Sequence, residues 1–108
     1  MLIDIEIHVE CENPDVITTF LAVVRARGEG LCGRREWKEG DKEVFLNMGD
    51  FIPLGICRTI SWLFPDEDII CEYDYLEAPW LIYRTEFLNG CVVKSYCRNI
   101  GNDELAPF

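Results

Sequence analysis

The chain has 108 residues, 49% of them hydrophobic, which suits one domain with a single hydrophobic core. Its formal net charge of −10, from 20 acidic and 10 basic residues, repels phosphate backbones, so direct nucleic-acid binding is not expected. No apolar run reaches about 18 residues and the N-terminus has no basic leader, so we predict no membrane span, no signal peptide and a cytoplasmic location.

Residues 2–11 alternate between apolar and polar side chains, which is the pattern of a half-buried strand. The side chains expected on its polar face are Asp4, Glu6, His8 and Glu10. Asn13-Pro14-Asp15 then predicts a helix start, because Asn can cap, Pro is tolerated in the first turn and Asp complements the positive helix end. Gly28 predicts the end of this helix.

The middle of the chain predicts a hairpin and a second helix. Leu31–Trp37 and Val44–Met48 read as its two strands, with a turn at residues 39–41. The second helix is expected to begin near Pro53 and to end before Pro65, which cannot continue a helix. Its expected apolar stripe consists of Ile56, Cys57, Ile60, Leu63 and Phe64.

Three further strands are predicted over residues 68–76, 80–88 and 91–98, the last two joined by the hairpin turn Asn89-Gly90. The element order βαββαβ followed by ββ favours an α+β fold, a ferredoxin-like sandwich with an extra C-terminal hairpin and two helices on one face of a mostly antiparallel sheet. We expect one domain over residues 1–100 and a tail over 101–108. The expected strand order is 91–98, 80–88, 68–76, 2–11, 44–48 and 31–37.

The six cysteines do not suggest a disulfide framework or a metal site, because no CxxC spacing occurs. Cys91 and Cys97 would lie about 20 Å apart along one strand, too far for a disulfide. We expect Cys11, Cys57, Cys71 and Cys91 to be buried small hydrophobes in a reducing compartment. Cys32, before Gly33-Arg34-Arg35, is interpreted as a partly buried, inert thiol.

One stretch of the chain resembles a known family. Ile52-Pro53, the helix end Ser61-Trp62-Leu63-Phe64-Pro65-Asp66, then Glu72-Tyr73 and Asn89-Gly90 are similar to the YubB-like ferredoxin-like domain family of phages and plasmids, over about residues 37–90. The resemblance implies a ferredoxin-like fold and a phage or mobile-element origin. It implies no catalytic residue.

Strand alternation predicts an acidic surface on the face of the sheet opposite the helices. Glu72 and Asp74 should lie there beside Asp4, Glu6, His8 and Glu10, because 68–76 and 2–11 are expected neighbours. Trp80, Arg84 and Glu86 should share this face. We interpret these nine residues as a candidate partner-binding surface, with solubilising charge as the alternative.

Chemistry at this surface is not predicted. Ligands at positions 6, 8 and 10 of one strand spread over about 13 Å, so no metal or other cofactor is expected. Catalysis by paired carboxylates needs a pocket, which an open sheet face seldom offers, so no catalytic residue is predicted.

The sequence therefore favours a non-catalytic acidic module that binds a basic, nucleic-acid-binding surface of a larger protein, in its sharpest version an anti-CRISPR-type inhibitor of a host defence system. The alternative is a small enzyme or a ligand- or metal-binding domain that uses the carboxylate–His face. The edge strand 91–98 could also pair with a second copy to form a homodimer.

Overall fold

The structure, a computed structural model, describes residues 5–26, 40–47, 52–75 and 78–99. Asp4, Cys32, the predicted strand 31–37 and the tail 101–108 lie outside these ranges. In chain order the described elements are β1 (Ile5–Glu10), α1 (Pro14–Ala26), β2 (Glu43–Asn47), α2 (Leu54–Leu63), β3 (Ile69–Tyr75), β4 (Ala78–Leu88) and β5 (Cys91–Asn99).

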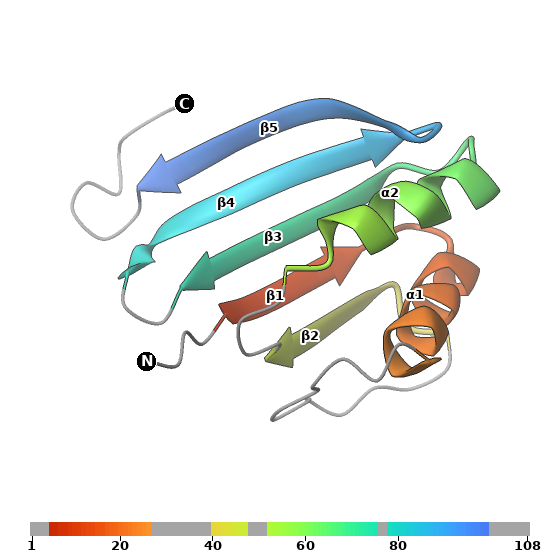
Figure 1. The fold of residues 1–108 in the computed structure, drawn as a ribbon, viewed down its shortest axis with the longest axis horizontal. Coiled ribbons are helices and arrows are strands. Elements are labelled where there is room, and N and C mark those ends of the chain that lie inside the picture. Colours follow the sequence, from red (N-terminus) through yellow and green to blue (C-terminus); the bar gives the residue numbers. More distant parts are fainter. Residues whose placement is uncertain (1–4, 27–39, 48–51, 76–77, 100–108) are drawn as a thin grey trace.

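The five described strands form one antiparallel sheet in the order β2-β1-β3-β4-β5. The chain is thus an α+β protein, and these strands have the neighbours expected from the sequence. Both helices lie on the same face of the sheet (Figure 1), where α1 contacts β2 and α2 contacts β3, β4 and β5. Neither described helix is long and apolar enough to cross a membrane.

The core fills the space between the helices and this sheet face. In β1 the odd-numbered side chains point inward and are buried, as the alternation predicts. The buried hydrophobic residues are Ile5, Ile7, Val9, Cys11, Val16, Ile17, Phe20, Leu21, Val24, Val44, Leu46, Ile56, Cys57, Ile60, Ile69, Cys71 and Phe87. Because the odd-numbered side chains of β1 and β3 point toward the helices, the even-numbered side chains of these strands lie on the opposite face of the sheet.

Local signals explain where the helices begin and end. The Asn13 side chain accepts a hydrogen bond from the Asp15 amide at 3.0 Å, so it caps α1 as predicted. Helix α2 ends at Leu63, just before Pro65. Its predicted stripe is wrong at one position, because Leu63 is 64% exposed and Ser61 is buried instead. Ser61 is buried because the β4–β5 turn packs on it.

The β4–β5 turn is fixed to α2 by its backbone. Asn89 and Gly90 both have positive φ, at 54° and 75°, as the predicted tight turn requires. The Gly90 amide donates to the Ser61 hydroxyl at 2.5 Å, and Arg58 donates to the Gly90 carbonyl at 2.9 Å. The positive φ favours glycine at position 90, and a Cβ there would also meet the ring of the exposed Trp62, which would have to shift.

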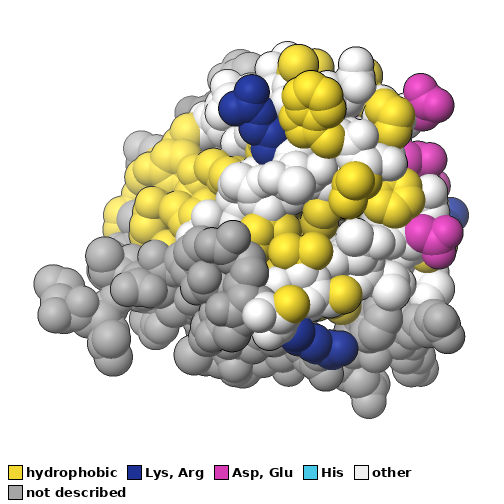
Figure 2. All heavy atoms as spheres, turned by 45° about the vertical axis from the view of Figure 1, so that its right-hand side comes forward, with side chains coloured by type: hydrophobic (Ala, Val, Ile, Leu, Met, Phe, Trp, Pro, Cys, Tyr) yellow, Lys and Arg dark blue, Asp and Glu magenta, His cyan; other side chains and the backbone are white. Residues whose placement is uncertain are grey.

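The outer strand β5 is more exposed than the sequence pattern suggested. Cys91 was predicted to be buried but is exposed, while Cys11, Cys57 and Cys71 are buried and all the described cysteines are free. The buried core includes no described residue of β5, although α2 contacts this strand, so most side chains of β5 are exposed. Hydrophobic side chains also reach the surface on the side of the molecule that carries the β4–β5 turn (Figure 2); exposed ones there include Trp62, Leu63, Leu88, Val92 and Val93.

Candidate functional site on the open face of the sheet

The open face, meaning the sheet face opposite α1 and α2, collects the acidic residues that the sequence singled out. Strand register pairs Glu6 with Asp74 and His8 with Glu72, so β1 and β3 bring these four side chains together as expected. Arg84 on β4 lies opposite Glu72 in the next strand. Among the described residues, both helices lie on the other face, so this surface is not covered by either.

A row of interacting side chains crosses the whole sheet at its centre. Register aligns Phe45, His8, Glu72, Arg84 and Tyr96, one from each strand. The rings of Phe45 and His8 stack with centroids 4.3 Å apart and an interplanar angle of 5°. Glu72 receives a hydrogen bond from Arg84 at 2.7 Å on one oxygen and lies 3.3 Å from His8 Nδ1 on the other. The Phe45 ring on one side and the Glu72 carboxylate on the other therefore fix the orientation of the His8 imidazole.

Glu72 is a carboxylate of the open face that has both an arginine and a histidine as neighbours. Burial alone would raise the pKa of Glu72, but the hydrogen bonds from Arg84 and His8 outweigh burial and hold this pKa below its ordinary value. The pair with Arg84 is half-buried, so it is screened less than a surface ion pair. Glu72 is therefore ionised at neutral pH and serves as the structural centre of the row.

Other carboxylates on and beside this face are arranged as like-charged pairs. Glu6 lies directly opposite Asp74, and burial together with the charge of Glu6 raises the pKa of Asp74. Burial and a hydrogen bond shared with Glu86 raise the pKa of Asp68 to about 6.

Glu10 and Glu43 make a third such pair, directly opposite each other on β1 and β2. Like charges facing each other across a sheet are destabilising. Cations of the protein itself lie beside two of these pairs, because Arg84 Nη1 lies 3.9 Å from Glu10 Oε1 and Lys94 is directly opposite Glu86. The repulsion within these two pairs is therefore partly offset.

A hollow of 460 Å³ opens at the end of β1, beside this third pair. It is lined by Glu10, Cys11, Glu12, Lys42, Glu43, Asp68 and Ile70. Four of these side chains are acidic and one is basic. Lys42 forms an exposed ion pair with Glu12 at 3.3 Å. Burial and neighbouring carboxylates raise the pKa of Cys11, so its thiol stays protonated and is a poor nucleophile at neutral pH.

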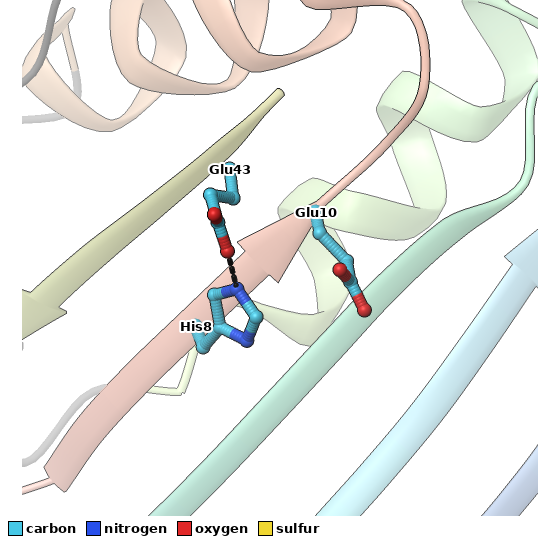
Figure 3. Close-up of side chains that lie close together, drawn as sticks. All are labelled: His8, Glu10 and Glu43. Carbon is cyan, nitrogen blue, oxygen red and sulfur yellow. Dashed lines mark hydrogen bonds and ion pairs between the residues drawn. The ribbon is translucent and has the colours of Figure 1, made fainter. Parts of the chain in front are cut away.

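His8 joins Glu10 and Glu43 in a compact group at the edge of this hollow. His8 Nε2 lies 2.7 Å from Glu43 Oε1. One ligand atom from each of the three residues lies within 4.8 Å of the other two. Figure 3 shows Glu43, from β2, in contact with the imidazole ring of His8, and Glu10, from β1, beside them.

Sequence reasoning missed two members of this site. Glu43 precedes the predicted strand, although the alternation that buries Val44 also places Glu43 on the open face. Asp68 was treated only as the start of a strand, and its contact with Glu86 depends on the β3–β4 pairing.

One isoleucine, one tyrosine and one tryptophan complete the surface. Ile82 and Tyr96 line a small hollow of 30 Å³ with Glu72, Arg84 and Arg98, so they lie on the open face. Trp80 is 44% exposed. The register between β3 and β4 shifts beyond Tyr73, so strand alternation does not carry over to Trp80.

No protein-family model, curated protein or solved structure matches this chain.

Proposed function

We propose that this chain is a non-catalytic binding protein whose open face engages a basic, nucleic-acid-binding surface of a larger protein. In this proposal the fold is ferredoxin-like, the protein acts in the cytoplasm, and it is encoded by a phage or mobile element. The sharpest version is an inhibitor of a host defence system, of the anti-CRISPR type, that occupies the site where the target holds nucleic acid.

The observation that carries the proposal is the set of three like-charged pairs, Glu6–Asp74, Glu10–Glu43 and Asp68–Glu86. Carboxylates used only for solubility can be spread apart, which avoids the cost of facing each other. Arg84 and Lys94 already offset part of this repulsion, and lysine or arginine side chains from a partner would relieve what remains. Complementary charge of this kind also accelerates encounter with a basic surface.

Hydrophobic and aromatic side chains between the charges support the same proposal. Phe45 is 38% exposed, and Ile82 and Tyr96 lie beside Arg84. Binding energy in protein interfaces is usually concentrated in aromatic residues and arginines surrounded by polar groups. Phe45 and Tyr96 stand at opposite ends of the central row, so a partner could contact apolar anchors on both sides of the acidic pairs.

The test is affinity capture from the lysate of the native host, with a variant that carries Glu6→Gln and Asp74→Asn. These substitutions remove one like-charged pair without disturbing the His8–Glu72–Arg84 contacts. The control variant carries Asp15→Asn and Asp66→Asn, which remove the same charge from exposed positions at the start of α1 and after α2. We expect wild type and control to retain one nucleic-acid-handling protein and the Glu6/Asp74 variant to lose it.

A competition step checks the nature of the captured surface. Excess nucleic acid should release the captured protein, because both ligands would occupy the same basic site, and higher salt should weaken capture. Equal capture by all three proteins, or capture that nucleic acid leaves unchanged, would contradict the proposal.

The alternative is a small enzyme or a ligand-binding domain that uses the carboxylate–His face. One observation favours it: the 460 Å³ hollow at the end of β1, because sites for small ligands are concave.

A further inference from the structure

We infer that His8, Glu10 and Glu43 form a binding site for a first-row divalent metal ion, of the Mn²⁺ or Zn²⁺ type. The inference does not depend on the proposed protein partner. It starts from the compact group at the edge of the hollow, in which one nitrogen and two carboxylate ligands come from two neighbouring strands. A site of this composition suits borderline cations, whereas Mg²⁺ and Ca²⁺ prefer oxygen ligands alone.

The distances suit one ion after a small adjustment. Metal–ligand bonds of about 2.0–2.2 Å place any two ligand atoms within about 4.4 Å of each other. The ligand atoms of the three residues lie within 4.8 Å. Glu10 and Glu43 have long side chains, with 37% and 56% of their side-chain surface exposed, so a rotation of either brings its oxygen into range. For Glu10 this rotation exchanges a long ion pair, with Arg84 Nη1 at 3.9 Å, for a bond to the metal ion.

The contacts that orient the His8 ring also support a metal site. A metal-binding histidine usually donates its other ring nitrogen to a carboxylate, which orients the ring. Here Nδ1 lies 3.3 Å from Glu72, Glu72 is held by Arg84 at 2.7 Å, and Phe45 stacks on the ring. These contacts leave Nε2 directed toward Glu43 rather than toward the core.

The hollow provides space for the remaining coordination positions. Glu10 and Glu43 line the 460 Å³ hollow, so an ion held between them would face open volume. Three protein ligands with an open side are typical of metal sites that keep water or a small ligand bound. The site therefore differs from a closed structural metal site.

The test uses Mn²⁺ alone, titrated into the full chain and followed by the electron paramagnetic resonance signal of the free ion. Mn²⁺ is chosen because it prefers oxygen and nitrogen over thiolates, so exposed cysteines such as Cys91 do not compete. We expect saturable binding of one ion. A tenfold excess of Mg²⁺ should displace Mn²⁺ only in part, because Mg²⁺ binds imidazole poorly.

A pair of matched variants separates a site from general attraction to acids. Glu43→Gln removes a ligand and should weaken binding about 10–100-fold, the range seen when even supporting groups of metal sites are lost. Glu12→Gln removes the same charge from the same hollow, at a position outside the three ligands, and should leave the affinity within about twofold. His8→Gln should weaken binding at least as much as Glu43→Gln. Circular dichroism checks that each variant is folded.

Three outcomes would overturn the inference. The first is no saturable binding by wild type at millimolar Mn²⁺. The second is an equal loss in the Glu43→Gln and Glu12→Gln variants, which would mean diffuse attraction. The third is unchanged binding without His8, which would mean that the His8–Glu43 contact is only an ion pair.

Discussion

Asp68 offers the sharpest quantitative test of the acidic surface. Burial and the hydrogen bond shared with Glu86 raise its pKa from 3.8 to about 6. A group whose pKa is higher in the folded state costs stability once it ionises. The contribution of Asp68 to the unfolding free energy should therefore fall as pH rises from about 4 to about 6, and its cost should be complete above that range. Asp68→Asn replaces the carboxyl with a neutral amide that can still donate to Glu86.

The size of the effect follows from the shift. About two pKa units correspond to about 3 kcal/mol at most, at 1.36 kcal/mol per unit. Asp68 is exposed, and solvent screens charges at such positions, so we reduce the expected gain to about 1 kcal/mol at pH 7 to 8. Below pH 4 the carboxyl is protonated in both folded and unfolded chains, so wild type and Asp68→Asn should then be equally stable.

The assay is urea denaturation of wild type and Asp68→Asn at pH 4, 5, 6, 7 and 8. Asp66→Asn is the matched control, because it removes the same charge two residues earlier, from another exposed position. The control should show no stabilisation that appears between pH 4 and 6. The reasoning would be refuted if the two variants behaved alike across this range, or if Asp68→Asn were less stable than wild type at pH 8.

Three further predictions test the fold around the site. Gly90→Ala should lower the unfolding free energy by about 1–3 kcal/mol, and by more than Gly40→Ala. Both residues have positive φ, but only at Gly90 would the added Cβ meet the Trp62 ring. Urea denaturation of both variants checks this. Cys91 should react with iodoacetamide in the native protein, and Cys57 only after unfolding, because Cys57 is buried and its pKa is raised; peptide mapping decides. Arg84→Gln should cost about 1–2 kcal/mol in thermal or urea unfolding, because it leaves a half-buried carboxylate without its cation; an unchanged stability would mean that the central row contributes little.

The sequence by itself determined the class of fold and the sides of the sheet. Alternation in residues 5–10 predicted which side chains face the core, and the buried set Ile5, Ile7 and Val9 agrees. Asn13, Pro65 and Asn89-Gly90 marked a helix start, a helix end and a hairpin turn, because these residues act through local backbone geometry. Signals of this kind depend on neighbours in sequence, which is why they could be read without the structure.

Strand alternation also anticipated the facing of Glu6 with Asp74 and of His8 with Glu72. The pattern failed where burial depends on a distant segment. Cys91 lies in an apolar pattern but is exposed on the outer strand, and Ser61 is polar but buried by the β4–β5 turn.

Only the tertiary structure decided which side chains share the candidate site. His8, Glu10 and Glu43 meet because the register of β1 on β2 aligns residues more than thirty positions apart in the chain. Asp68 meets Glu86 through the separate pairing of β3 with β4. The hollow forms where the ends of these strands come together. Periodicity fixes the face on which a side chain lies, but the register between strands fixes its neighbours, because a shift of two residues keeps every side chain on the same face and changes every partner.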